Sequence, residues 1–257
     1  MTKPQEHKLI SVITVVFNNR AGLERTLNSI AAQEDRSAME YIVVDGGSTD
    51  GTLELIRSHE QLIDRWVSEP DRGLYHAMNK GMSMARGNYL WFMNSGDAMY
   101  DSHALQAVLH AAEHDADFVF GDTMFISPDG REIGLMSRVT PKKLPEHPGP
   151  RTFSYGMNIC HQSVVVKRNM APEYNEAYRM VADIDWIIRI LNKNPRTAQC
   201  AQPLARFELG GISQQRIRRS WKERFRVLAI HYGFLPTLFR HLVLLFRSLA
   251  FRLIAAK

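Results

Sequence analysis

Cysteine is scarce in this chain. Only Cys160 and Cys200 occur among 257 residues, and their spacing matches neither a metal site nor a disulfide framework. This pattern favours a reducing compartment. The opening residues, MTKPQEHK, lack the apolar region of a signal peptide, so nothing in them suggests secretion. Apolar residues nevertheless make up 45% of the chain, which is enough for a sizeable core.

Acidic residues are nearly absent from residues 216–257. This segment has one acid, Glu223, and ten of the 32 Lys and Arg residues. In residues 1–215, the other 22 basic residues are outnumbered by 26 acidic ones, so the basic net charge of +5 belongs to the C-terminal segment. This distribution argues against a nucleic-acid-binding body and for a tail that meets an anionic surface.

Long uncharged apolar runs are also missing from the tail. Arg240, Arg247 and Arg252 interrupt it, so no run reaches the ~18 residues of a spanning helix. Basic residues interleaved with large apolar ones are typical of a helix in the membrane interface. We therefore expect residues 216–257 to form a basic amphipathic helical tail that associates with the membrane surface. The alternative is a helix hairpin that covers the sheet and keeps its arginines at the surface.

Strands and helices alternate along the first hundred residues. Apolar runs predict strands that begin at 9, 41, 65 and 88, with helical patterns between them at 21–33, 53–58 and 74–87. This order is typical of βαβ units and a parallel sheet. Further along we expect helices at 102–114 and 182–193, strands at 117–126 and 160–168, and a long proline-rich loop at 137–158 that acts as a mobile lid.

Small polar and acidic residues follow each of the first four strands. Ligands of parallel sheets bind beyond the carboxyl ends of the strands, and these ends carry Asn18, Asp45, Asp71 and the run Asn94-Ser95-Gly96-Asp97. Asp45 suits a nucleobase or ribose better than phosphate, because the turn after it matches neither common phosphate-binding glycine motif. Asp97 suits Mg²⁺ or Mn²⁺, which bind through one or two carboxylates and the phosphates of a substrate. The sequence therefore predicts a ligand-binding site at the edge of the sheet formed by the carboxyl ends of these strands.

Four segments resemble those of the inverting glycosyltransferases of family 2, which have the GT-A fold: SVITVVFN, YIVVDGGSTDGT, EPDRGLYHAMNKGMSMARG and WFMNSGD. The similarity is strong over about residues 9–100 and weaker to about 213, and it is greatest to bacterial exopolysaccharide enzymes of the colanic-acid type. It implies an α/β GT-A domain at 1–215, with a Rossmann-like, mostly parallel sheet flanked by helices. Its nucleotide-sugar half would span about 1–126 and its acceptor half about 127–215, followed by the tail.

The resemblance also implies roles for individual residues. Asp45 would contact the base of a nucleotide sugar, Asp97 would bind Mg²⁺ or Mn²⁺, and Asp183 would be the general base that deprotonates the acceptor hydroxyl. Asn94-Ser95-Gly96-Asp97 stands where many relatives have Asp-Ser-Asp-Asp, so one carboxylate remains of three. The further candidates for substrate binding are Asn18, Asp71, Arg72, Asn79, Lys80, Asn94, Ser95, His161 and Asp185, of which Arg72, Lys80 and His161 could stabilise the leaving diphosphate.

The implied function is transfer of a sugar from a UDP- or GDP-sugar to a lipid-linked oligosaccharide, in the synthesis of bacterial exopolysaccharide or another cell-surface polysaccharide. We expect the protein to be cytoplasmic and peripheral on the inner face of the plasma membrane, without a nucleic-acid partner. One alternative is a sugar nucleotidyltransferase, although FNNRAGLERTL is a poor match to the loop that such an enzyme needs. The other alternative is a nucleotide-sugar-binding or scaffold protein that has lost catalytic activity. Its support is the smaller number of acidic residues in NSGD and the presence of Ala182 where the family usually has Glu.

Overall fold

A seven-stranded sheet forms the centre of the protein. The structure, a computed structural model, describes residues 10–210 and 217–243. The strands follow the order β10-β6-β9-β4-β1-β2-β3, and β9 is antiparallel to both neighbours whereas every other pair is parallel. They are β1 (Ile10–Val16), β2 (Met39–Asp45), β3 (Arg65–Ser68), β4 (Tyr89–Phe92), β6 (Phe118–Phe120), β9 (Val164–Lys167) and β10 (Thr197–Gln199).

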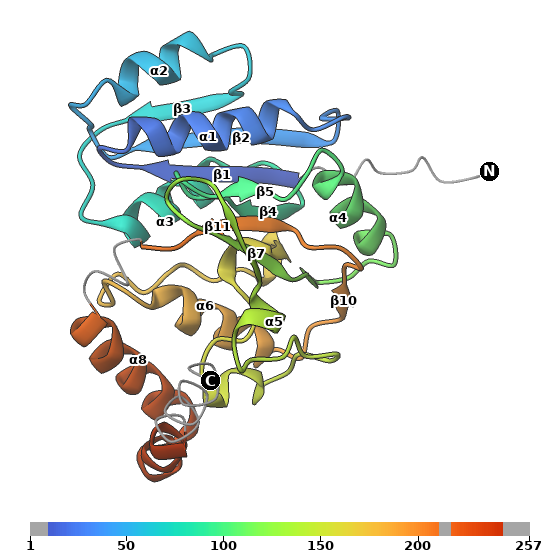
Figure 1. Cartoon of the computed structure of the whole chain (residues 1–257), viewed down its shortest axis with the longest axis vertical. Helices are drawn as coiled ribbons and strands as arrows, with labels where there is room; N and C mark the ends of the chain where they lie inside the picture. The colour runs from blue at the N-terminus through green and yellow to red at the C-terminus, as the bar shows by residue number, and fades with distance from the viewer. Residues whose placement is uncertain (1–9, 211–216, 244–257) are drawn as a thin grey trace.

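Helices cover both faces of this sheet (Figure 1). Because strand side chains alternate between faces, Val12 packs with α1 (Arg20–Ala31), α2 (Thr52–Ser58) and α4 (Ala104–Ala112) on one side. Its neighbour Ile13 packs with α3 (Leu74–Met84) and α6 (Ala182–Leu191) on the other. The expectation of a mostly parallel sheet flanked by helices is confirmed.

A second sheet of four short strands lies beside the end of β4. Its order is β5-β11-β7-β8, formed by β5 (Ala98–Met99), β11 (Ala205–Glu208), β7 (Thr123–Ile126) and β8 (Glu132–Leu135). β11 runs antiparallel to β5, with Arg206 opposite Ala98. This register brings Glu208 next to Gly96, where a Cβ atom would lie 3.7 Å from a Glu208 carboxylate oxygen.

Several predicted elements differ from those observed. The strand expected at 117–126 is divided at Gly121 into β6 and β7, where a Cβ atom would lie 2.7 Å from Leu204 Cγ. The strand expected at 160–168 shortens to β9, preceded by a 3₁₀ turn, η2 (His161–Ser163), and followed by η3 (Arg168–Met170). The expected loop at 137–158 includes most of α5 (Met136–Val139) and all of η1 (Thr152–Tyr155), and Pro150 O accepts a hydrogen bond from Tyr232.

The described part of the tail is a pair of helices. α8 (Ile217–Tyr232) packs on α6 and contributes Val227 and Leu228 to the core under the sheet. The chain is helical again at 234–243, and the Phe225 ring contacts both Phe234 and His241. The inner face of α8 thus covers the body of the protein, which agrees with the helix-hairpin alternative. Residues 244–257 lie outside the described part of the chain.

Candidate active site

The polar residues after β1, β2 and β4 are tied together by hydrogen bonds. Asp45 is fully buried and accepts from the Ser48 backbone N–H at 3.1 Å and from Ser68 Oγ at 2.6 Å. Asn18 N–H donates to Ser48 Oγ at 2.8 Å, and Asn18 Oδ1 accepts from Thr49 N–H at 2.9 Å. On the other side, Asn19 Nδ2 donates to Ser95 O at 3.2 Å. The loops after these three strands therefore form one continuous polar edge.

Asp71 extends this edge beyond β3. Its carboxylate accepts from Lys80 Nζ at 2.8 Å and lies 2.9 Å from His76 Nδ1. A Cβ atom on Gly46 would lie 3.2 Å from the second oxygen of Asp71. A side chain at position 46 would therefore crowd an acid that is already in place.

Asp97 is buried beside Gln162, whose Nε2 donates to Asp97 Oδ2 at 2.8 Å. Burial raises the pKa of Asp97 to about 8, and the Gln162 hydrogen bond offsets part of that rise. Asn94 Oδ1, in the same turn, is buried without a hydrogen-bond partner. A carboxylate and an unpaired amide oxygen are the ligand types that Mg²⁺ and Mn²⁺ take, and a cation here would restore the charge of Asp97.

No group of three or more His, Cys, Asp or Glu residues suited to a metal occurs in the described residues. The NSGD turn thus fits a divalent ion that takes most of its ligands from substrate and water, as Mg²⁺ commonly does.

Asp183 begins the second half of the site, in the first turn of α6. The Tyr75 hydroxyl donates to Asp183 Oδ1 at 3.2 Å. Burial raises the pKa of Asp183, whereas the Ile184 backbone, Tyr75 and the positive charge of Arg224 lower it. The residue as a whole is half-buried. A half-buried carboxylate with a raised pKa is suited to accept a proton.

Asp185 faces a different neighbour. It is 6% exposed, forms an ion pair with Arg189 at 2.8 Å and lies 2.8 Å from His231 Nε2. The structure therefore places Asp185 between α6 and α8, where its carboxylate oxygens are engaged by protein groups.

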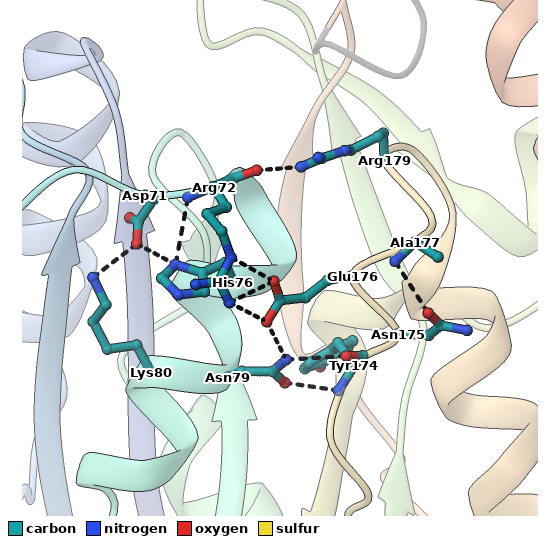
Figure 2. Close-up of polar contacts among 10 residues, drawn as sticks. All are labelled: Asp71, Arg72, His76, Asn79, Lys80, Tyr174, Asn175, Glu176, Ala177 and Arg179. Atoms are coloured by element: carbon teal, nitrogen blue, oxygen red, sulfur yellow. Dashed lines mark hydrogen bonds and ion pairs between the residues drawn. The ribbon is translucent and has the colours of Figure 1, made fainter.

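The residues around α3 contact the 174–179 segment, as Figure 2 shows. Arg72 is paired with Glu176 at 2.9 Å, and Lys80 with both Glu69 and Asp71 at 2.8 Å. The Asn79 side chain accepts from Tyr174 N–H at 2.7 Å and donates to Tyr174 O at 3.0 Å. A pocket beside these contacts is lined by Leu74, Tyr75, His76, Glu176, Tyr178 and Arg179.

His161 lies in an aromatic cluster under the site. Its Nε2 is 2.7 Å from the Tyr174 hydroxyl, and its ring contacts Phe92 and Trp186. Burial lowers the pKa of His161 to about 3, so the ring is neutral at pH 7. It does not supply the positive charge considered for it from the sequence. Tyr174, which stacks on both Tyr75 and Trp186, links this cluster to the side chain that holds Asp183.

Cys160 connects the two halves of the site. Burial raises the pKa of the thiol to about 12, and the charges of both Asp97 and Asp183 add to the rise. Its Sγ donates to Gln162 Oε1 at 3.0 Å, and Gln162 in turn holds Asp97.

Sequence reasoning missed several residues of this site. Glu208 and Gln162 approach Asp97 from β11 and η2, and the Glu208 charge contributes to the raised pKa of Asp97. Tyr75 lies within the LYHAMNKG motif, so its hydroxyl in the first turn of α3 could have been noticed. Arg224, whose positive charge lowers the pKa of Asp183, carries no local signal, because it lies on α8, far along the chain.

Comparison with known proteins agrees with the fold. The family model for Glycosyl transferase family 2 matches residues 11–171. An uncharacterized glycosyltransferase of Mycobacterium tuberculosis is 47% identical over 212 residues, covering 80% of this chain and 78% of the relative. A PGL/p-HBAD biosynthesis glycosyltransferase of Mycobacterium bovis is 32% identical over 229 residues, covering 84% and 83% of the two chains.

Two solved structures share this architecture. Staphylococcus aureus TarS, residues 1–349, superposes with a TM-score of 0.67 at 17% identity, covering 91% of this chain and 71% of TarS. The mannosyltransferase PcManGT from Pyrobaculum calidifontis, in complex with GDP-Man and Mn²⁺, gives a TM-score of 0.61 at 18% identity, covering 90% and 73%. At these identities the likeness concerns the fold.

Proposed function

The chain belongs to glycosyl transferase family 2 and is a glycosyltransferase, and we propose that it transfers a sugar, with inversion, from a UDP- or GDP-sugar to a lipid-linked oligosaccharide. The observation that carries the proposal is the continuous polar edge formed by the loops after β1, β2 and β4, where the buried Asp97 lies in one turn with the unpaired oxygen of Asn94. Separate solved structures of similar fold hold UDP, UDP-GlcNAc or GDP-Man, which supports a nucleotide-sugar donor. The nucleotide-sugar half is proposed at about 1–126 and the acceptor half at about 127–215.

The chemistry proposed for the chain uses opposite faces of one sugar. Asp45 and the Asn18 loop hold the nucleoside, and the NSGD turn lies at the diphosphate. Asp183 takes the proton of the acceptor hydroxyl as that oxygen attacks the anomeric carbon. The nucleoside diphosphate leaves from the opposite face, so the configuration inverts in one step. Asp97 and Asn94 would hold Mg²⁺ or Mn²⁺, which when bound supplies positive charge against the diphosphate.

The acceptor is proposed to be presented at a membrane surface. The outer face of the tail exposes large apolar side chains, among them Leu235 at 74% and Phe239 at 66%. α8 also exposes Arg218, Arg219, Lys222 and Arg226, and anionic lipids attract such groups. No helix in the described residues could cross a bilayer by length and hydropathy. We place the reaction at the cytoplasmic face of the plasma membrane, in the synthesis of bacterial exopolysaccharide or another cell-surface glycan.

A donor screen tests the proposed function. Purified protein would be incubated with Mn²⁺ and a panel of UDP- and GDP-sugars, with and without a detergent extract of bacterial lipid-linked oligosaccharides, and the released nucleotide measured. We expect one donor class to be consumed, faster with the acceptor extract. Consumption of no donor under either condition would contradict the proposal.

Tyr75→Phe is expected to shift the acid side of the pH dependence of kcat/KM to higher pH. Asp183 must be deprotonated to act as a base, so activity falls as the pH drops through its raised pKa. Loss of the Tyr75 hydrogen bond removes a group that favours the charged carboxylate, so this pKa rises further. The alkaline side of the pH dependence of kcat/KM should stay where it is in the wild type. A profile identical to that of the wild type would contradict the role given to Tyr75.

Leu235→Asp is expected to weaken binding to vesicles containing phosphatidylglycerol by about tenfold or more, because a charge replaces an exposed apolar anchor. Cosedimentation with these vesicles measures the effect. Ile133→Asp, at an exposed apolar residue on β8, is the control and should bind like the wild type. Equal binding by both variants would contradict the surface assigned to the tail.

A further inference from the structure

Glu223 is the one acidic residue in the basic segment 216–257. A carboxylate at a surface that meets anionic lipids weakens the attraction that the neighbouring cations provide. The structure does not leave this carboxylate at that surface. The Glu223 side chain is 14% exposed, whereas that of its ion-pair partner Arg219 is 54% exposed. Glu223 therefore faces the body of the protein, and its role has to be sought there.

Glu223 holds the backbone of the segment that leads into α6. Its Oε2 accepts hydrogen bonds from the N–H groups of Arg179 at 2.9 Å and Met180 at 2.8 Å. Its Oε1 accepts from Arg219 Nε at 3.0 Å, one turn earlier on α8. Hydrogen bonds to a charged acceptor are stronger than those between neutral groups. One side chain of α8 thus fixes two successive peptide groups immediately before α6.

The start of α6 needs such support from outside the helix. Helices usually begin at a residue whose side chain accepts from the first turn, such as Ser, Thr, Asp or Asn. The N-cap residue of α6 is Val181, which in the described structure makes no such bond. Asp183 follows in the first turn, where its Oδ1 lies 3.2 Å from the Tyr75 hydroxyl. A shift of this turn would move the proposed base away from Tyr75.

The same segment is also connected to the donor side of the site and to the core. The Arg179 guanidinium donates to the backbone oxygen of Arg72, the residue after Asp71, as Figure 2 shows. α8 itself is firmly placed, because Val227 and Leu228 are buried in the core cluster that includes residues of α6. Glu223 therefore joins a fixed helix to the short segment that lies between Asp71 and Asp183.

We infer that Glu223 is a positioning residue for Asp183. It acts on the reaction through the backbone of Arg179 and Met180, which sets where α6 begins and where the Asp183 carboxylate lies. The inference rests on the proposed function, because the role of Asp183 as base belongs to that function. A displacement of about 1 Å at a reacting group can cost ~10²-fold in rate. α8 would then serve catalysis with its inner face and the membrane with its outer face.

Kinetics of Glu223→Ala and Glu223→Gln test this inference. The amide oxygen of the Gln variant can still accept from both N–H groups, whereas the Ala variant loses both bonds. With the donor and acceptor extract of the screen, we expect Glu223→Ala to lower kcat about 10-fold or more. The donor KM and the affinity for UDP or GDP should stay close to those of the wild type. Glu223→Gln should retain most of kcat, and so should the control Glu173→Ala, at an exposed acid of the same segment.

Glu223→Asp covers the case in which Glu223→Ala does not fold. It keeps the charge but is one methylene shorter, so it should reach the two N–H groups less well and also lower kcat. Wild-type kcat in whichever of these two variants folds would overturn the inference. An equal loss of kcat in Glu223→Gln would also overturn it, because the effect would then follow the charge of residue 223 and not its two backbone hydrogen bonds.

Hydrogen exchange tests the contact without any transfer reaction. The amides of Arg179 and Met180 should exchange faster in Glu223→Ala or Glu223→Asp than in the wild type or Glu223→Gln, because their acceptor is lost. Unchanged exchange at both amides would contradict the hold of Glu223 on this segment. An inactive wild-type protein with the expected exchange pattern would count against the proposed function and not against this contact.

Discussion

Asp183→Asn is expected to slow sugar transfer by about 10²–10⁴-fold, the usual contribution of a well-placed general base. The amide keeps the size of the side chain and can still accept from the Tyr75 hydroxyl, so the local packing should survive. The affinity for UDP or GDP should stay close to that of the wild type. Single-turnover transfer and isothermal titration with the nucleotide measure the two quantities separately.

Asp185→Asn is the matched comparison, two residues away on the same helix. Because Asp185 pairs with Arg189 and His231, its loss should weaken the attachment of α8 and lower the melting temperature. It should leave the acid side of the pH profile in place, because the base is intact. If Asp183→Asn turned over at the wild-type rate, or if only Asp185→Asn were inactive, the assignment of the base would be wrong.

Asp97→Asn is expected to reduce transfer by about 10²-fold or more and to remove the stimulation by Mn²⁺. A neutral amide binds a hard cation less well than a carboxylate does. Gln162 can still donate to the amide oxygen of the substituted side chain, so the turn should fold as before. Bound Mn²⁺, counted by electron paramagnetic resonance in the presence of UDP or GDP, reports the loss independently of activity.

Asp101→Asn is the control for Asp97→Asn. The Asp101 carboxylate accepts from His103 N–H at 3.0 Å, away from the NSGD turn. Its variant should retain both Mn²⁺ binding and transfer. Full Mn²⁺ stimulation in the Asp97→Asn variant would contradict the metal role.

The sequence predicted the edge of the site because strand ends are locally encoded. Apolar β-branched runs stop at Asn18, Asp45 and Asn94, and a parallel sheet brings such ends together whatever the rest of the chain does. The start of α6 could be predicted for the same reason, because Asp183 precedes a helical pattern of buried residues. These parts of the fold follow from periodicity alone.

Charge pairing could not be predicted from the sequence, because it joins distant segments. Nothing near Arg72 indicates that Glu176 will face it, and Lys80 meets Glu69 and Asp71 only when α3 packs against β1 and β2. Burial also decides protonation, as it does for His161. Arg72 and Lys80 are therefore paired with carboxylates in the folded protein, and His161 is neutral.

The tail illustrates the same limit. Its basic, amphipathic pattern indicated a surface helix, and Leu235 and Phe239 are indeed exposed. The pattern did not reveal that Val227 and Leu228 pack into the core or that Arg224 acts on Asp183. An amphipathic pattern shows that a helix has an apolar face. It does not show whether that face packs on the protein core or binds a membrane.

The most direct test of the account is a crystal structure with Mn²⁺ and the intact nucleotide sugar that the donor screen selects. We predict the nucleobase at Asp45, the diphosphate and metal at Asp97, and the anomeric carbon between the diphosphate and Asp183. A nucleotide bound on another face of the sheet, or a sugar whose anomeric carbon Asp183 and an incoming hydroxyl cannot reach, would contradict it.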